Sequence, residues 1–510
     1  MMVDPRTPVI VGVGQFTERI DAEDYRGMSS VDLATEAARA ALADTGADPD
    51  AIAAAIEVFV ALRQFEICTP FSEAPLGCSD NYPRSVAARI DANPARAVLE
   101  PLGGHGSQKV VTEFAGAIAA GDHEVVLVLG SENGSTLRYF AGREDKPDHS
   151  ETVGGQLEDR GYGFDQYMNE YTATHGLTGA PVQYGLLDNA RRARLGATVA
   201  DYRRAMAELF APFSEVAAKN PLASSPVQRS VDELATVTAE NRMICDPYPR
   251  LMVARDQVNQ GAAVLMMSVA AARRLGVPEG NWVYLHGHAD LVEQPLLDRV
   301  DLSASLSADK AVAEALRVAG LTLDEVSTFD LYSCFPFPVF SVCDSAGLAT
   351  DDPRGLTLTG GLPFFGGPGN SYSLHGIAET VLSARERPGQ FGLVGANGGV
   401  MSKYSVGVYS STPVEWAADH SAELQAQIDE QPTVAVTRHP EGPGTIETYS
   451  VRYDWPTTTG VIIGRLDADN SRFMALTTDA DLLALMADGD PLGAAITVTA
   501  GAKENYATLA

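Results

Sequence analysis

Residues 103–132 read GGHGSQKVVTEFAGAIAAGDHEVVLVLGSE and contain a glycine-rich turn, a helix and a strand in succession. Apolar residues recur at helical spacing over residues 106–121, and the glycine that ends this run is typical of a helix C-terminus. The aliphatic run at residues 124–130 predicts a strongly apolar strand. A helix that begins directly at a glycine-rich turn is typical of α/β proteins that bind a ligand at a helix N-terminus.

The chain contains two similar successions of strand, helix and strand. Gly46 aligns with Gly320 as a predicted helix cap, at an offset of 320 − 46 = 274 residues, and Asp50 aligns with Asp324 at the same offset. This regularity indicates an internal duplication. The aligned strand, helix and strand are residues 8–14, 29–43 and 52–62 in the first copy and residues 281–288, 308–319 and 326–331 in the second.

A second glycine-rich turn, at residues 366–369, precedes a predicted helix at 371–387 and a strand at 391–395. Each copy therefore carries a central helix that begins at a glycine-rich turn. Two related helix N-termini that face a shared seam would form a ligand site.

The remaining segments predict two further parts. Residues 131–255 are polar and glycine-rich and then helical, and we expect a loop domain over the seam. After residue 416 short strand-like runs are separated by turns, which predicts a small β domain. The expected domains are residues 1–130 (first half), 131–255 (loop domain), 256–416 (second half) and 417–510 (small OB-like β domain).

The composition excludes several classes of function. The 510 residues include 37 Lys and Arg against 67 Asp and Glu, and the net charge of −30 repels nucleic acids and anionic membranes. No segment resembles a signal peptide or reaches the length needed to span a bilayer, so we expect a cytoplasmic protein without a membrane span. The five cysteines are odd in number and lack a C-x-x-C pair, which predicts free thiols and no metal site.

Six segments in order resemble the landmarks of thiolases, and Cys334-Phe335 places the chain near the sterol-carrier-type thiolases. The resemblance covers about residues 5–412 and implies a duplicated thiolase fold, two β-α-β-α-β halves with mixed sheets and central helices. It also implies CoA or acyl-CoA as the ligand and a homodimer. The segments are PVIVGVGQ at 8–15, residues 103–132, NQGAAVLMMS at 259–268, DLYSCFPF at 330–337, GGLPFFGGPGNS at 360–371 and GANGGVMS at 395–402.

The four catalytic residues of thiolases are replaced in this chain. The resemblance implies a cysteine nucleophile, an asparagine that holds a water, a histidine and a second cysteine. The corresponding positions hold His105, Tyr332, Gly367 and Ala396. We therefore do not expect an ordinary cysteine acyl-enzyme.

His105 and three other side chains are candidates for a role at the seam. His105 at a helix N-terminus would tend to be neutral and could act as a base or orient a carbonyl, or it could form a hydrogen bond inside a vestigial pocket. Cys334 could face the ligand or be an inert buried thiol. His375 could approach the seam or pack within its helix, and Asn397 could donate to a carbonyl oxygen or satisfy its own turn.

Basic residues predict where CoA phosphates would bind. Arg191, Arg192, Arg194 and Lys219 lie in the loop domain, which by resemblance covers the pantetheine and the nucleotide. The alternative is a solvated helical face.

Two functions remain open from the sequence. The first is an acetyl-CoA acetyltransferase-like acyltransferase of lipid or sterol metabolism with altered catalysis and no tightly bound cofactor. The second is a non-catalytic acyl-CoA-binding subunit or scaffold that acts with a partner protein, which could dock through the C-terminal domain.

Overall fold

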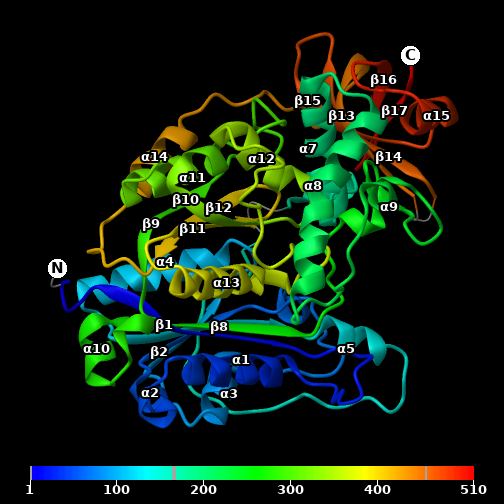
Figure 1. Cartoon of the computed structure of the whole chain (residues 1–510). Coiled ribbons are helices and arrows are strands. Elements are labelled where there is room, and N and C mark those ends of the chain that lie inside the picture. The colour runs from blue at the N-terminus through cyan, green and yellow to red at the C-terminus, as the bar shows by residue number, and fades with distance from the viewer. Residues whose placement is uncertain (1–2, 164–167, 454–456) are drawn as a thin grey trace.

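The computed structural model describes residues 3–163, 168–453 and 457–510. Layers of helices alternate with layers of strands, and there are five layers in all (Figure 1). Helices α4 and α13 form the central layer, between the strands of the first half and those of the second half (Figure 1). The main elements of the first half are β1 (Pro8–Thr17), α1 (Ser30–Asp44), α2 (Pro49–Ala55), β2 (Val58–Leu62), α3 (Tyr82–Arg89), β3 (Arg96–Glu100), α4 (Gly106–Ala120), β4 (Val125–Glu132), α5 (Gly134–Tyr139), β5 (Glu158–Asp159) and β8 (Gln260–Ser268). The main elements of the second half are β9 (Val283–Val292), α11 (Leu306–Ala319), β10 (Val326–Leu331), α12 (Pro336–Ala346), α13 (Tyr372–Glu386), β11 (Phe391–Gly398) and β12 (Lys403–Ser410).

The first strands of the two halves pair with each other and join all the strands of both halves into one sheet. In this antiparallel pair Val9 lies opposite Tyr284, and Ile10 lies opposite Val283. The resulting order is β10-β11-β12-β9-β1-β8-β4-β2-β3-β5. The mixed α/β fold predicted from the sequence is confirmed.

The duplication is visible in the way each first strand meets its helix. A methyl group added at Gly12 would stand 2.1 Å from the carbonyl oxygen of Ala41 in α1, and one added at Gly287 would stand 1.9 Å from that of Ala315 in α11. Only glycine permits so close an approach. The helix residues differ by 315 − 41 = 274, as predicted, whereas the strand glycines differ by 287 − 12 = 275.

One predicted strand is partly a helix. We expected a strand over residues 52–62, but α2 occupies the start of this range and β2 only its end. The side chain of Asp48 caps α2 by accepting a hydrogen bond from the backbone of Asp50, and Pro49 fits the first helical turn. Local capping and the alanine run of α2 therefore outweigh the apolar pattern.

The sheet of the first half includes a strand that follows the region between the halves. Strand β8 pairs with β1 and β4, where Ala263 lies opposite both Gly14 and Leu129. Residues 260–268 thus complete the sheet of the first half, although the chain reaches them only after the loop domain. Strand β8 thus lies between β1 and β4 and is antiparallel to both.

The region between the halves is mainly helical and is linked to the C-terminal domain. Strand β6 joins the sheet of that domain, where Cys245 lies opposite Arg452. The helices and strands of this region are α6 (Glu170–Thr174), α7 (Ala180–Leu195), α8 (Val199–Lys219), α9 (Val231–Ala235), β6 (Met243–Cys245) and β7 (Tyr248–Pro249).

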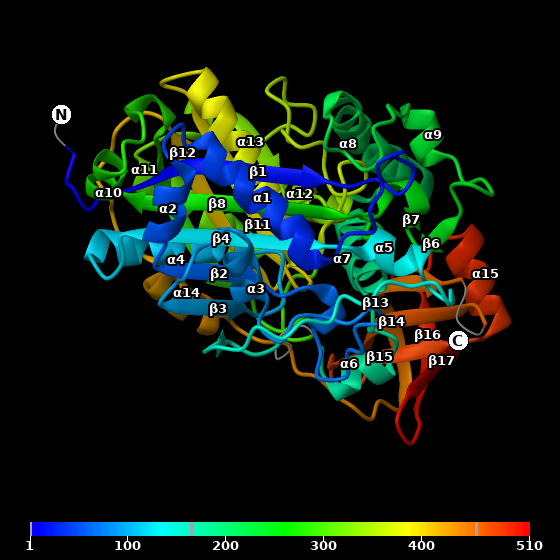
Figure 2. The ribbon, with the colours of Figure 1, turned by 90° about the horizontal axis from the view of Figure 1, so that it is seen from below.

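The C-terminal part contains a small β-barrel, which lies at one end of the molecule beside α6 and α7 (Figure 2). Strand β13 pairs with both β14 and β16, so five strands close on themselves in the order β14-β15-β17-β16-β13. Residues 432–438 are one of the strand-like runs expected after residue 416, but their pairing is limited to a bridge between Val436 and Arg472. The elements are α14 (Ser421–Asp429), β13 (Gly442–Arg452), β14 (Thr459–Leu466), β15 (Arg472–Thr477), α15 (Ala480–Asp488), β16 (Ala495–Ala500) and β17 (Asn505–Leu509).

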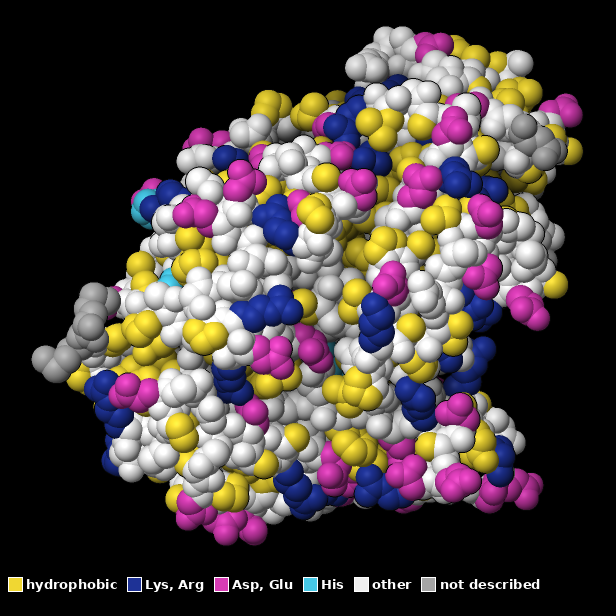
Figure 3. Space-filling view, viewed as in Figure 1, with side chains coloured by type: hydrophobic (Ala, Val, Ile, Leu, Met, Phe, Trp, Pro, Cys, Tyr) yellow, Lys and Arg dark blue, Asp and Glu magenta, His cyan; other side chains and the backbone are white. Residues whose placement is uncertain are grey.

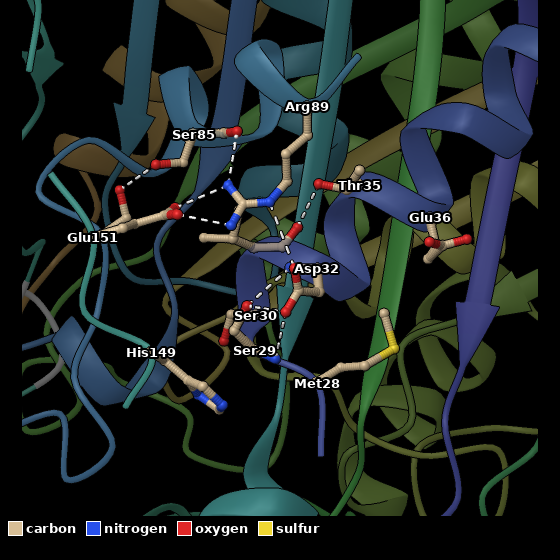
Figure 4. Close-up of polar contacts among 12 residues, drawn as sticks. Met28, Ser29, Ser30, Asp32, Thr35, Glu36, Ser85, Arg89, His149 and Glu151 are labelled. Carbon is tan, nitrogen blue, oxygen red and sulfur yellow. Dashed lines mark hydrogen bonds and ion pairs between the residues drawn. The ribbon is translucent and has the colours of Figure 1, made fainter. Parts of the chain in front are cut away.

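The outer edge of the first half is covered by the segment that follows α5. Strand β5 pairs with β3 and is held there by an ion pair of 2.7 Å between Glu158 and Arg96. Arg89 binds Glu151 at 2.7 Å and approaches Asp32 of α1 at 3.5 Å (Figure 4). Strand β3 therefore does not present an open edge.

Candidate functional site

A cavity of about 1010 Å³ opens at the N-terminal ends of the two central helices. Its inner end is lined by buried residues, and its outer part by exposed or half-buried arginines. The walls between are largely apolar and include Leu102, Tyr184, Leu251, Phe335, Leu362 and Phe364. The shared seam predicted from the two glycine-rich turns is thus hollow in the structure.

His105 caps α4 without lining the cavity. Its Nδ1 atom is buried without a hydrogen-bond partner, and it lies so close to Gly398 that a methyl group there would stand 2.3 Å away. Burial, together with the charges of Lys403 and Lys109, holds the pKa of His105 well below its usual range. The imidazole is therefore neutral and is turned into the protein.

The other three positions that correspond to thiolase catalytic residues carry no acid or base of suitable strength. Tyr332 and Gly367 line the cavity, and Ala396 is fully buried in β11. A methyl group at Gly367 would stand 3.3 Å from the nearest atom, the carbonyl oxygen of Arg255, so even a Cβ atom would be a tight fit at this position. Burial raises the pKa of Tyr332 well above its usual range.

Cys334 and Asn397 lie together at the inner end of the cavity. Burial raises the pKa of the Cys334 thiol to about 12, so it is protonated and a poor nucleophile at neutral pH. The side-chain nitrogen of Asn397 lies 3.8 Å from this sulfur and donates to the hydroxyl of Tyr184 at 2.6 Å. The amide of Asn397 is thus engaged by Tyr184 of α7, and its part in binding a carbonyl oxygen stays a prediction.

His375 does not reach the cavity in the structure. It is fully buried, its Nδ1 atom lies 2.7 Å from the side-chain oxygen of Gln15, and its ring packs edge-on against Phe365. Burial lowers its pKa to about 3. At the end of the first turn of α13, the side chain faces β1 rather than the seam.

The four basic residues predicted to bind CoA are placed in ion pairs away from the cavity lining. Arg191 and Arg194 both bind Asp344, and Arg192 binds Asp490 of the C-terminal domain. Lys219 pairs with Glu215, one turn earlier in α8. Their part in CoA binding stays a prediction, and the geometry offers other arginines for it.

Arginines that the sequence reading missed lie at the outer part of the cavity. Arg250 and Arg255 follow β7 and are close enough for the charge of Arg250 to lower the pKa of Arg255, after burial as the larger cause. Two cations that repel each other at a cavity favour an anionic ligand. Figure 3 shows Lys and Arg side chains gathered at the margin of the molecule, level with the space between α9 and α5. The basic side chains that line the cavity are Arg138, Arg229, Arg242, Arg250, Arg255 and Lys403.

One signal in the sequence could have found this basic group. Arg250 and Arg255 stand six and one residues before Asp256, in a short segment that leads into NQGAAVLMMS. A loop that precedes a buried strand at a sheet edge is a common place for ligand contacts.

The described part of the chain shows neither a metal site nor a helix that could span a membrane. Within residues 3–163, 168–453 and 457–510 no group of three or more His, Cys, Asp or Glu side chains could hold a metal ion. In the same described residues no helix is long and apolar enough to cross a bilayer.

The paired halves, the central helices and the cavity at their N-termini define a thiolase-like protein. Residues 423–503 match the family model of the thiolase-like protein type 1 additional C-terminal domain. Over the full length of both chains, the sequence is 61% identical to a monomeric SCP2-thiolase-like protein type 1 (STLP1) from Mycobacterium smegmatis, with a TM-score of 0.88. The chain belongs to the SCP2-thiolase-like protein type 1 family.

More distant solved structures share the fold alone. An Ltp2-ChsH2(DUF35) aldolase is 19% identical, with a TM-score of 0.56, and the dimeric peroxisomal thiolase of Saccharomyces cerevisiae is 14% identical, with a TM-score of 0.57. Each covers 80% of this chain and 98% of its own. No curated protein sequence matches the chain.

Proposed function

We propose that the protein binds an acyl-CoA-like thioester in the cavity between the two halves and does not form a cysteine acyl-enzyme. The observation that carries this proposal is the pair Arg250 and Arg255 at the outer part of a cavity of about 1010 Å³. Guanidinium groups bind phosphate in a fixed, bidentate geometry, and an anion between them would relieve their repulsion. The apolar walls suit a pantetheine arm and an acyl chain.

The inner end supports binding rather than acyl transfer. A thiolase-type reaction needs a thiolate, but Cys334 is protonated and His105 is buried outside the cavity lining. We therefore favour the reading of a non-catalytic acyl-CoA-binding protein of lipid metabolism over that of an acetyl-CoA acetyltransferase-like enzyme. The cytoplasm remains the expected compartment.

We further propose that the C-terminal domain supports the cavity wall within the same chain. The hydroxyl of Thr448 in β13 donates to the carbonyl oxygen of Leu186 in α7, and the side chain of Asn189 donates to the carbonyl oxygen of Tyr449. Helix α7 carries Tyr184, which lines the cavity. The domain would thus be part of the site, whether or not it also binds a partner protein.

Calorimetric titration of the full chain with CoA tests the phosphate site. Arg250→Ala together with Arg255→Ala should weaken CoA binding at least tenfold, since each lost phosphate contact typically accounts for about 1 kcal/mol or more. Arg204→Ala, on the exposed face of α8, is the matched control and should leave the affinity unchanged. If the double variant binds CoA as tightly as the unmodified chain, the phosphate site is misplaced.

A thiolysis assay with acetoacetyl-CoA tests the second half of the proposal. We expect no turnover above the uncatalysed rate. Turnover that Cys334→Ala abolishes would overturn the view that the site lacks a working nucleophile.

A further inference from the structure

The ring of Tyr332 is held rigidly at the inner end of the cavity. Its backbone N–H donates to the carbonyl oxygen of Gly395 at 3.0 Å, and its ring meets Tyr372 edge-on, with centroids 5.4 Å apart. A methyl group added at Gly104, directly before α4, would stand 2.3 Å from the Tyr332 hydroxyl oxygen. The hydroxyl therefore lies against the backbone that leads into α4.

This hydroxyl group has no hydrogen-bond partner among the described residues, although it lines the cavity. Its neighbour Tyr372 differs, because that hydroxyl bonds Thr359 at 2.7 Å and donates to Asp330 at 3.2 Å. An O–H group that is taken from water without a new acceptor costs roughly 1 to 3 kcal/mol. Tyr332 is thus a donor that a ligand can satisfy.

The surroundings decide which kind of acceptor fits. The arginines of the cavity lie in its outer part, whereas its inner end holds the neutral thiol of Cys334 and the amide of Asn397. Lys403 also lines the cavity and its charge acts on His105, but a phosphate beside Cys334 would lack the guanidinium partners of the outer part. The N-terminus of α4, a helix of 15 residues, favours an oxygen with partial negative charge. A polarised but uncharged carbonyl oxygen meets both conditions.

We propose that the Tyr332 hydroxyl binds the carbonyl oxygen of the thioester, so that the site distinguishes an acyl-CoA from CoA that carries no acyl group. The inference rests on the proposed function and adds a specificity-determining residue to it. A site with a buried donor discriminates against an analogue that lacks the acceptor, because the donor is then left unpaired. Because burial raises the pKa of the neighbouring Cys334 thiol to about 12, this hydrogen bond serves recognition rather than acyl transfer.

Calorimetric titration of the full chain with acetyl-CoA and with S-ethyl-CoA tests the proposal. The two ligands share the nucleotide, the pantetheine arm and the chain length, but the thioether lacks the carbonyl oxygen. We expect the unmodified chain to bind acetyl-CoA about tenfold more tightly, as one buried hydrogen bond predicts. Tyr332→Phe should weaken acetyl-CoA binding to the level of S-ethyl-CoA and leave S-ethyl-CoA binding unchanged.

Tyr404→Phe is the matched control. The Tyr404 hydroxyl likewise has no hydrogen-bond partner among the described residues, but it is buried and does not line the cavity. This variant should keep the tenfold preference. A loss of preference in both variants would indicate a general packing effect and would overturn the role of Tyr332.

Isotope-edited infrared spectroscopy provides an independent readout. The carbonyl stretch of ¹³C-labelled acetyl-CoA should move to lower frequency on binding to the unmodified chain and should not move with Tyr332→Phe. If the Tyr332→Phe variant prefers acetyl-CoA over S-ethyl-CoA as strongly as the unmodified chain does, the inference is refuted, although the proposed CoA site stands. Failure of every CoA compound to bind refutes the proposed function itself.

Discussion

The hydroxyl of Tyr184 donates a hydrogen bond of 2.7 Å to the carbonyl oxygen of Gly399 and so ties α7 to the turn between β11 and β12. The Tyr184 hydroxyl oxygen itself accepts from the side chain of Asn397 at 2.6 Å and from the backbone of Met401 at 3.3 Å. Met401 has a positive φ of 47°, a conformation that non-glycine residues rarely adopt. The phenol of Tyr184 therefore holds a strained turn at the cavity.

Tyr184→Phe should loosen this turn. The variant keeps the ring, which stacks on Phe335 at 4.6 Å, and removes the one oxygen that three groups share. We expect a loss of about 2 kcal/mol in the free energy of unfolding and faster backbone hydrogen exchange at residues 397–401. Tyr506→Phe, on the exposed surface of β17, is the control. Unchanged exchange in this turn would show that Tyr184 does not hold it.

The ion pair between Arg192 and Asp490 joins α7 to the C-terminal domain. Arg192 is only 1% exposed and binds both carboxylate oxygens of Asp490, at 2.9 and 3.0 Å. Asp490→Ala leaves this buried charge without its counter-ion. Because Asp490 is half exposed and Arg192 also donates to Asn189, we expect a loss of about 1 to 2 kcal/mol in chemical unfolding. Asp481→Ala, exposed in α15, should change little, and equal stability of the two variants would contradict the prediction.

Cys334 should resist alkylation in the folded protein. With a pKa of about 12, fewer than about one thiol in ten thousand is ionised at pH 7.5, and the side chain is buried. Iodoacetamide treatment followed by peptide mass spectrometry should find Cys334 unmodified until the protein is unfolded. Rapid modification in the folded state would reveal a reactive thiolate and would reopen acyl transfer.

The sequence predicted those features of the fold that depend on local pattern. The strand at residues 326–331 and the central helix after His105 were placed correctly, because apolar spacing and glycine caps act within a few residues. Strand β5 has only two residues and no apolar pattern, so its pairing with β3 could not be predicted.

The candidate site was less predictable because its decisive contacts join distant residues. Arg191 binds Asp344 across 153 positions and Arg192 binds Asp490 across 298, so the spacing of the arginines did not reveal their partners. The replaced positions were found from the motifs, but the contact of Tyr332 with Gly104 needed the tertiary structure. Ion pairs and contacts between such distant residues leave no periodic pattern in the sequence.

The covered edge of β3 predicts a monomer, in contrast to the dimer expected from the resemblance. Strand β5 occupies the edge, and Arg160 adds ion pairs to Glu100 at 2.9 Å and Glu113 at 2.7 Å. A second chain would have to displace these contacts before its own strand could pair. Light scattering should give the mass of one chain up to concentrations of tens of micromolar. A mass of two chains would mean that another surface forms the contact.

The stability of the protein should fall in acid through His375. In the unfolded chain this histidine takes up a proton below about pH 6.5, whereas burial lowers its folded pKa to about 3. The unfolded state therefore binds more protons between these values, and stability declines as the pH falls through this window, by up to about 1.4 kcal/mol per pH unit. His375→Gln keeps a donor toward Gln15 and should reduce the slope of unfolding free energy against pH between 6 and 4.5. His439→Gln, at an exposed site, should keep the full slope, and identical slopes in both variants would show that His375 titrates normally.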